Sequence, residues 1–348
     1  MTDQADMEKF RVALASNNLA PLWDMMRRLA PRAPEAGGGV PAIWKWPALR
    51  EQVLRAGELI SAQEAERRVL VLQNPGFPGE GRATTSLYAG IQLLLPGETA
   101  PSHRHTASAI RLIMEGYCAF TAVDGERVTM APGDFIVTPS GTFHDHGNDG
   151  SEPVLWLDGL DVFLVNLLNA SFGEDHPSRR QPVERREGTS GARYAAGLKP
   201  ADHPFDAVRS PFFCWPYAQT IAALRASAEA GHIDPALGAG TWFVDPATGQ
   251  SPVRSMTAGM ALFPKGFEGQ RYRAISGAVM SVVEGSGKVS VGDRTWAVGP
   301  RDVFVVPSWQ WHAFNAHEDM VVFSFSDQEL QRHLGFWRDE RAQLEEFS

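Results

Sequence analysis

The feature of this sequence that most constrains its fold is an internal repeat. Ile113–Asn148 and Val282–Asn315 follow the same order of residue types: two apolar residues before Glu-Gly, a strand-like run, a turn, a second run, a Pro-x-Asp step, an apolar run, Pro-Ser, and an aromatic residue before His. Short β-type runs separated by Gly, Pro, Asn and Asp are typical of antiparallel sandwiches and barrels. We therefore expect one supersecondary β unit to occur twice in the chain.

Helical patterns flank the repeated units. Apolar residues fall at helical intervals over Met7–Arg28, with a break at Ala20-Pro21, and again over Pro47–Leu59. A short helix is predicted near Tyr217–Ala230, and an amphipathic helix over Gln328–Glu346. The sequence thus predicts five segments: a helical N-terminal segment with the first strands (1–84), a first barrel (85–168), a solvated connector (169–240), a second barrel (241–327) and a C-terminal helix (328–348).

The composition is that of an ordinary globular protein. Its 348 residues, 43% of them hydrophobic, suffice for one large or two modest cores. The formal net charge of −9 leaves no cationic surface for phosphate groups, so nucleic acid is not an expected partner. No apolar run approaches the length of a membrane span and the first residues are acidic, so we expect a cytoplasmic protein without a membrane partner. Cys118 and Cys214 form no CxxC pair and are expected to be buried, with Cys118 inside a strand.

The first copy of the repeat contains closely spaced histidines. They fit the two cupin motifs, which read here as Gly97-x5-His103-x-His105 and Gly133-x5-Pro139-x-Gly141-x2-His144-x3-Asn148. Residues i and i+2 of a strand point to the same face, so His103 and His105 should enter a barrel together and meet His144 there. Three buried imidazoles need a polar partner, which a divalent first-row metal supplies. The predicted fold is an all-β bicupin, two double-stranded β-helix (jelly-roll) barrels with N-terminal and C-terminal helices, and these three histidines are its predicted metal ligands.

The predicted ligand set contains no carboxylate. Many cupins add a glutamate a few residues after the histidine pair, but here Ala109 or Ile110 stands at that position. Three neutral ligands leave the metal with its full double charge and three open positions. Such a site suits an anionic chelating substrate together with dioxygen.

The second copy of the repeat lacks most of these ligands. Tyr272 and Ala274 align with the two histidines of the first motif, and only His312 remains of the triad. We therefore expect a second barrel without metal, in which the aromatic residues of "PSWQWH" serve packing or an interface.

Two further polar residues are expected beside the metal. Arg111 lies six residues after His105, an even spacing that points it inward, and its guanidinium suits a carboxylate. The alternative for Arg111 is a structural ion pair with Asp158 or Glu115. His146 shares a face with His144 and could hydrogen-bond the substrate or oxygen as an acid or base, or could instead support a ligand.

Several blocks of the sequence resemble one family throughout. "AIWKWPALR", "ERRVLVLQNPG", "LYAGIQLLLPGETAPSHRHTASAIRLIMEGY", "TFHDHGNDG" and "LWLDGLD" are similar to blocks of the gentisate 1,2-dioxygenases, which are bicupin iron enzymes that open the ring of 2,5-dihydroxybenzoate. The resemblance implies Fe(II) at the histidine triad, a small aromatic acid and O2 as reactants, and a homotetramer. It also implies oxygen insertion between the carboxyl-bearing and hydroxyl-bearing ring carbons.

The same resemblance implies roles for residues around the metal. Asp158 would act beside Arg111 and His146 by orienting Arg111 or a ligand histidine. Arg67 matches a substrate-side arginine of the family, although the adjacent Arg68 is an alternative. The residues implied on the substrate side are Arg67, Tyr88, Gly90, Gln92 and Arg111.

Departures from the family pattern leave the substrate open. They are Gly141 and Phe143 in place of two tryptophans, Phe163 in place of a proline, Cys118 in place of a glycine, and Gly90 where some gentisate enzymes have alanine. The candidate substrates are therefore gentisate, salicylate, 5-nitrosalicylate or another 5-substituted salicylate, and 1-hydroxy-2-naphthoate. Hypotheses from other classes are a non-redox cupin, either an isomerase or a ligand-binding module, and a storage or structural bicupin.

Overall fold

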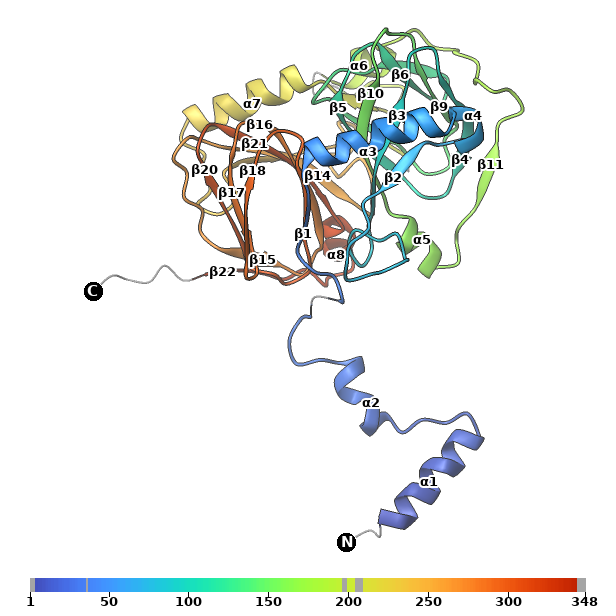
Figure 1. The fold of residues 1–348 in the computed structure, drawn as a ribbon, viewed down its shortest axis with the longest axis vertical. Helices are drawn as coiled ribbons and strands as arrows, with labels where there is room; N and C mark the ends of the chain where they lie inside the picture. Colours follow the sequence, from blue (N-terminus) through green and yellow to red (C-terminus); the bar gives the residue numbers. More distant parts are fainter. Residues whose placement is uncertain (1–3, 36, 196–198, 204–208, 343–348) are drawn as a thin grey trace. The chain divides into compact units, whose positions relative to one another are not determined.

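The computed structural model describes residues 4–35, 37–195, 199–203 and 209–342 (Figure 1). Residues up to Glu35 form one compact unit and the rest of the described chain forms another. In the first unit, α1 (Gln4–Ser16) and α2 (Leu22–Leu29) are separated at the predicted break and joined by an ion pair of 2.9 Å between Arg11 and Asp24. None of the helices in the described ranges has the length and apolar character needed to cross a membrane.

The first barrel consists of two antiparallel sheets. Their strand orders are β12-β8-β5-β10-β3-β2 and β11-β4-β9-β6-β7. The strands are β2 (Val69–Val71), β3 (Tyr88–Leu94), β4 (Thr99–His105), β5 (Ala109–Glu115), β6 (Ala119–Val123), β7 (Glu126–Thr129), β8 (Phe135–Thr138), β9 (His144–Asn148), β10 (Val154–Leu160), β11 (Gly173–Asp175) and β12 (Cys214–Trp215). The short helices α4 (Ala62–Ala65), α5 (Val162–Leu167) and α6 (Thr189–Tyr194) lie in the connections around it.

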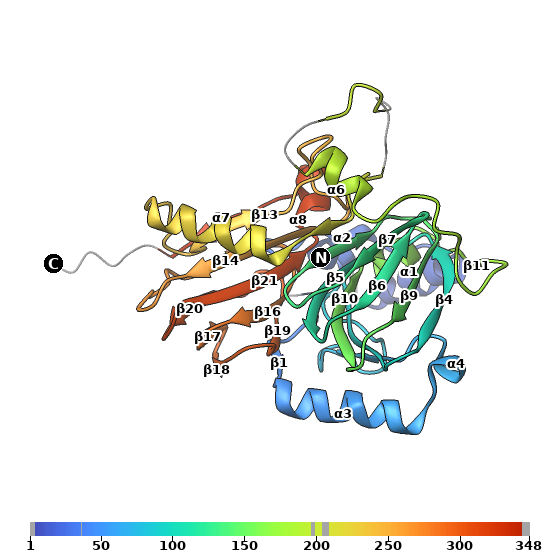
Figure 2. The same cartoon turned by 90° about the horizontal axis from the view of Figure 1, so that it is seen from above.

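The second barrel repeats this arrangement. Its sheets have the orders β1-β19-β16-β21-β14-β13 and β18-β17-β20-β15-β22. The strands are β1 (Ala42–Trp44), β13 (Ala239–Trp242), β14 (Thr257–Phe263), β15 (Tyr272–Ala274), β16 (Ala278–Glu284), β17 (Gly287–Val291), β18 (Arg294–Val298), β19 (Val303–Val306), β20 (His312–Ala316), β21 (Met320–Ser326) and β22 (Asp339–Arg341). Figure 2 shows the two barrels side by side. The predicted bicupin fold is confirmed.

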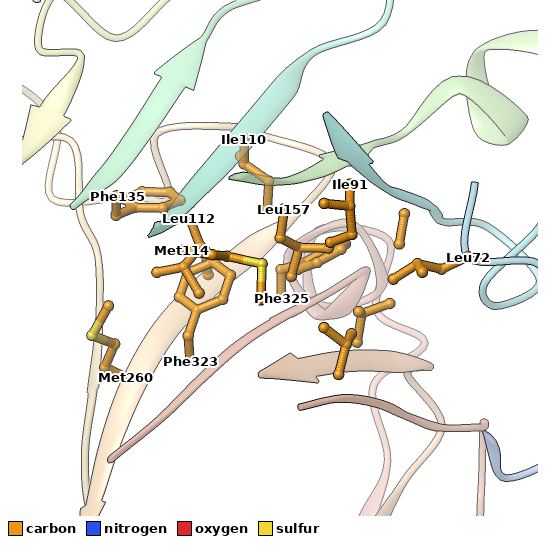
Figure 3. Close-up of a cluster of buried hydrophobic side chains, with 14 of the residues drawn as sticks. Leu72, Ile91, Ile110, Leu112, Met114, Phe135, Leu157, Met260, Phe323 and Phe325 are labelled. Atoms are coloured by element: carbon orange, nitrogen blue, oxygen red, sulfur yellow. The ribbon is translucent and has the colours of Figure 1, made fainter. Parts of the chain in front are cut away.

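The main hydrophobic core lies between the barrels, where the two six-stranded sheets face each other. Leu157 and Phe323 belong to this core, which Figure 3 shows in close-up. On β10 the neighbouring Trp156 points the other way, into the first barrel, because side chains alternate across a strand. The central strands of these sheets, such as β5 and β10, are therefore buried on both faces, and every second residue is directed into a barrel.

The repeat is larger than the sequence indicated. In each barrel the Asp of the Pro-x-Asp step accepts the first backbone N–H of a helix: Asp302 from Trp46 of α3 (Trp46–Leu59) and Asp134 from Tyr217 of α7 (Tyr217–Glu229), both at 2.8 Å. β1 before α3 pairs with β19 of the second barrel, and β12 before α7 pairs with β8 of the first. Each helix then packs on the other barrel, α3 on β3 and α7 on β13 and β14. The barrels thus exchange a strand-helix unit.

Two local predictions are wrong where the backbone has positive φ. Cys118 has φ 66°, is exposed and lies in the turn between β5 and β6, because an L-residue in the left-handed region interrupts a strand. The predicted C-terminal helix over residues 328–348 extends only over α8 (Gln328–His333), because Gly335 at φ 72° ends it, and β22 follows. Residues 343–348 lie outside the described residues. Cys214 is half-buried on β12.

The predicted connector contributes strands to both barrels. Within residues 169–240, β11 pairs with β4 and β12 pairs with β8 of the first barrel, while β13 begins the second. The predicted helix near Tyr217–Ala230 is confirmed as α7. Residues 196–198 and 204–208 of this segment lie outside the described residues. The five segment boundaries therefore stay predictions.

Candidate metal centre and active site

Two neighbouring strands of the first barrel bring the predicted metal ligands together. His103 and His105 are on β4, His144 begins β9, and the strand register places His144 opposite His103. One ring nitrogen from each of the three histidines lies within 4.8 Å of the others. The Nε2 atoms of His103 and His144 are 3.1 Å apart. The three ring nitrogens are thus close enough to hold a single metal ion.

The hydrogen bonds of the rings orient those lone pairs. Nδ1 of His105 lies 2.7 Å from the Ala107 carbonyl oxygen, and Nδ1 of His144 lies 3.1 Å from the Thr142 carbonyl oxygen. A carbonyl oxygen only accepts, so each Nδ1 carries the proton and each Nε2 keeps a free lone pair. Burial, with Arg67 nearby, lowers the pKa of His103 to about 3, so its ring is neutral at pH 7. Three neutral imidazoles, two of them with Nε2 lone pairs fixed by these hydrogen bonds, fit a divalent first-row metal.

The structure also settles which residue stands where other cupins have a glutamate. Ala109 lines the cavity beside the triad, whereas Ile110 points into the core between the barrels. The candidate ligand set therefore contains three neutral side chains and no carboxylate.

Arg111 lies inside the barrel, as its spacing predicted, and it also forms the ion pair left as an alternative. Its Nε atom is 3.1 Å from Oδ1 of Asp158, and both side chains are almost fully buried. Trp156 donates to the other carboxylate oxygen over 3.1 Å, and burial raises the pKa of Asp158 to about 6 against the opposing effect of Arg111. Glu115 pairs with Arg50 on the outside instead. Arg111 thus lies between the Asp158 carboxylate, its ion-pair partner, and the hydroxyl of Thr138, which accepts a hydrogen bond from its Nη1 atom.

His146 and Gln92 present unused hydrogen-bonding atoms to the same cavity. His146 is 1% exposed, and neither of its ring nitrogens has a hydrogen-bond partner among the described residues. Burial, together with Arg111, lowers its pKa well below the usual value, so the ring is neutral. The side-chain amide nitrogen of Gln92 likewise has no partner in the described part of the chain. Buried polar atoms left in this way indicate a site completed by a ligand.

Arg67 rather than Arg68 reaches the cavity. Arg67 donates to the Pro101 carbonyl oxygen, and its Nη2 atom is 3.1 Å from Nδ1 of His103. Burial and the nearby Arg111 lower the pKa of Arg67 to about 10, which leaves it charged at neutral pH. Arg68 forms an ion pair with Glu98.

Tyr88 lines the cavity, whereas Gly90 lies behind the side chains of Tyr88 and Val69. Gly90 is not a lining residue, but a Cβ atom at its position would lie 2.7 Å from the Tyr88 hydroxyl oxygen and 2.6 Å from Cγ1 of Val69. The absence of a side chain at Gly90 therefore allows Tyr88 and Val69 to occupy their present positions.

The cavity has a volume of about 240 Å³ and an apolar wall that the sequence did not reveal. This wall consists of Val69, Leu160 and Val162. Leu160 could have been found, because it is two residues after Asp158 on the same strand face. Val69 could not, since its place depends on the pairing of β2 with β3 opposite Gln92.

Most of the departures from the family pattern lie outside this cavity. Phe143 packs on the ring of His176 with 4.8 Å between centroids, and Phe163 packs under the guanidinium of Arg82. Gly141 is likewise absent from the cavity lining. Among the substituted positions named in the sequence, only Gly90 touches the cavity wall.

Comparisons with known proteins agree with this geometry. The cupin domain family matches residues 90–163 and 260–326, one region in each barrel. The chain is 43% identical to gentisate 1,2 dioxygenase 1 of Aquipseudomonas alcaligenes, over 97% of this chain and 96% of that protein. It is 32% identical to 5-aminosalicylate 1,2-dioxygenase of Comamonas sp, over 97% and 91%.

A solved structure extends the likeness to three dimensions. A crystal structure of salicylate 1,2-dioxygenase from Pseudoaminobacter salicylatoxidans, an adduct with gentisate, superimposes with a TM-score of 0.92 at 30% identity. The match covers 99% of this chain and 96% of that one. Fold, repeat and histidine triad thus coincide with full-length sequence similarity, and the chain belongs to the gentisate and salicylate 1,2-dioxygenase family of bicupin ring-cleaving enzymes.

Proposed function

We propose that this protein is an Fe(II)-dependent dioxygenase that inserts both atoms of O2 between the carboxyl-bearing and hydroxyl-bearing carbons of gentisate. The observation that supports it is one cavity of about 240 Å³ that contains three neutral, convergent histidines together with the buried guanidinium of Arg111. A metal with open positions beside a fixed cation suits an aromatic acid that chelates through its carboxylate and ortho hydroxyl.

The residues around the triad have different roles in binding the substrate. When bound, Fe(II) would supply the sites at which the substrate and dioxygen are brought together. Arg111, held by Asp158, and Arg67 provide positive charge for the substrate carboxylate. Neutral His146 accepts the proton of the substrate's ortho hydroxyl group, or it donates a hydrogen bond to dioxygen. The apolar side chains of Val69, Leu160 and Val162 in the same cavity provide the surface against which the ring packs.

Gentisate is favoured over other salicylates by where the substitutions lie. Phe143, Phe163 and Gly141 do not line the cavity, so they give no reason for a changed substrate. Gly90 is the exception, because it sets the positions of Tyr88 and Val69. Salicylates with another group at ring position 5 remain the second candidates through this one contact.

Oxygen consumption is the decisive measurement. Protein loaded anaerobically with Fe(II) is mixed with gentisate, salicylate, 5-aminosalicylate, 5-nitrosalicylate or 1-hydroxy-2-naphthoate, and the ring-opened product is followed by absorbance. We expect the highest kcat/KM with gentisate, and a loss of turnover in Arg111→Met with iron content unchanged. No oxygen uptake with any of the five acids, at full iron occupancy, would overturn the proposal and favour a non-redox cupin.

The assembly is part of the same proposal. The family resemblance implies a homotetramer, and sedimentation analysis of the purified protein tests this. A monomer at working concentration would contradict it.

A further inference from the structure

The second barrel contains a larger cavity than the first. It measures about 610 Å³, against about 240 Å³ beside the histidine triad. Tyr272, Ala274 and His312 line it, at the positions that correspond to the three metal ligands of the first barrel. The second barrel thus has open space at the positions where the first barrel has its candidate metal ligands.

Strand register identifies what replaced the polar side chains. On β16 and β21, Met280 lies opposite Ser324, just as Arg111 lies opposite Asp158 on β5 and β10. A thioether and a hydroxyl thus stand where the first barrel has its buried ion pair. By the same correspondence, Phe314 occupies the position of His146, and all of these second-barrel residues line the cavity.

Among the described residues that line the cavity there is no arginine or lysine, and the one carboxylate is paired. Asp234 lies at the wall, but Arg341 pairs with both of its carboxylate oxygens at 2.7 and 2.8 Å. The replacement of Arg111 by Met280 removes the cation that suits a carboxylate. An uncharged ligand is therefore favoured over an aromatic acid.

His312 presents a buried hydrogen-bond acceptor to this cavity. His312 is 6% exposed, and its Nδ1 atom lies 3.3 Å from the Gln310 carbonyl oxygen. That carbonyl only accepts, so Nδ1 carries the proton and Nε2 is left with a lone pair. No hydrogen bond to Nε2 is present among the described residues. Burial lowers the pKa of His312 to about 4, so the lone pair is free at pH 7.

Aromatic side chains surround this acceptor. The ring of Tyr272 stands edge-on to His312 at 5.6 Å between centroids, and Phe314 does so at 6.0 Å. Phe263, stacked on Phe314 at 4.5 Å, Trp242 and Trp337 complete the aromatic part of the wall. Mostly apolar walls with a few placed polar atoms are the usual composition of small-molecule sites of this size.

We propose that the second barrel is a binding site for an uncharged hydroxylated aromatic molecule, a phenol without a carboxylate, whose hydroxyl donates to Nε2 of His312. The aromatic wall packs against the ring of the ligand. The site is independent of the metal centre and of the dioxygenase activity.

Calorimetric titration with 1-naphthol tests the site in the iron-loaded protein under anaerobic conditions. We expect one equivalent to bind, with saturating gentisate and the His103→Ala substitution leaving its affinity unchanged. Ala274→Trp, which fills the cavity, should abolish binding. His312→Phe keeps the volume but removes the acceptor, so it should weaken 1-naphthol roughly 3- to 10-fold and leave naphthalene unaffected.

Several outcomes would overturn the proposal. They are absence of binding up to the solubility limit of 1-naphthol, displacement by gentisate, loss of binding in His103→Ala, or wild-type affinity in folded Ala274→Trp. Val322→Phe is a milder filling variant for the case in which Ala274→Trp fails to fold, and it is expected to weaken binding. Equal affinity of His312→Phe for 1-naphthol would remove the role assigned to the imidazole.

Discussion

In the first barrel Arg111 and Asp158 form a buried ion pair, and in the second barrel Met280 and Ser324 occupy the same paired positions. The interiors of the two barrels have diverged in this way, yet the contacts that join the barrels have not. Both Pro-x-Asp carboxylates, Asp134 among them, accept the first N–H of a helix that crosses to the other barrel. The two repeats therefore share the contacts that join the barrels, while a histidine triad is present among the described residues of the first barrel alone.

A second reciprocal contact supports this view. Asp161 of the first barrel accepts a hydrogen bond from the hydroxyl of Ser255, which precedes the second barrel. Asp327 of the second barrel accepts one from the hydroxyl of Ser86, which precedes the first. Asp161 also accepts the backbone N–H of Ser108 at 2.8 Å, in the loop whose Ala107 carbonyl orients His105. The segment that precedes the second barrel is thus connected, through Asp161, to the loop beside His105, a candidate metal ligand.

The largest expected difference between the barrels concerns their equivalent histidines. His144→Ala removes one of three metal ligands, so tight Fe(II) binding and turnover should both fall below detection. His312→Ala, the matched change in the second barrel, should leave iron content and kcat within about twofold of the wild type, because no metal triad surrounds it. Metal analysis and oxygen uptake measure both. Iron loss in His312→Ala would contradict the assignment of a single metal centre.

The next largest difference is expected in the unfolding free energy lost when a methionine is truncated in the core between the barrels or in the second barrel. Met114 is 3% exposed in the core between the barrels, so Met114→Ala should lower the free energy of unfolding by about 2–5 kcal/mol. Met280 lines the large cavity of the second barrel, and Met280→Ala should cost less than half as much because fewer packing contacts are lost. Urea unfolding of the two variants gives the comparison. Equal costs would mean that the cavity is closed in solution.

The reciprocal aspartates should differ in their effect on the metal rather than on stability. Asp161→Ala and Asp327→Ala each remove a buried acceptor and should each cost about 1–3 kcal/mol of unfolding free energy. Only Asp161→Ala frees the loop beside His105, so only it should weaken metal binding, by roughly 10-fold. Chelator competition with Co(II) measures this. Equal metal affinity in both variants would break the proposed connection.

The sequence pattern predicted the repeated fold and the clustering of the three histidines because both rest on local spacing. Side chains alternate across a strand, and this alternation along β4 and β9 is enough to place His103, His105 and His144 on one inner face. The same alternation placed Arg111 inside the barrel. Position across strands is not local. The apolar wall at Val69 and the second cavity depend on sheet register and on which side chains are missing, and neither leaves a periodic signal.

Positive φ explains the local errors. A strand through Cys118 and a long helix past His333 both follow from hydrophobic pattern alone. The turn at φ 66° and the left-handed Gly335 interrupt those patterns. The exchanged helices α3 and α7 were found from periodicity, but their attachment to the opposite barrel required the contacts of Asp302 and Asp134.

The smallest expected effect lies in the pH dependence of the ion pair that only the first barrel has. Burial raises the pKa of Asp158 from the usual 3.8 to about 6, so between these values the folded metal-free protein binds more protons than the unfolded chain. Stability contributed by this group is therefore present at low pH and lost as the pH rises, by about 1 kcal/mol between pH 5 and 6.

The control is a double variant in which Arg111 and Asp158 are replaced by the residue types of Met280 and Ser324, their counterparts in the second barrel. In Arg111→Met/Asp158→Ser this loss should vanish, and stability at pH 7 should match or exceed that of the wild type, since removing a buried ion pair as a whole is often neutral or stabilising. Urea unfolding of both chelated proteins at pH 5 and 6 measures the difference. A slope that persists in the double variant would assign the titration to another buried acid, and the comparison of the two interiors would then lose its electrostatic part.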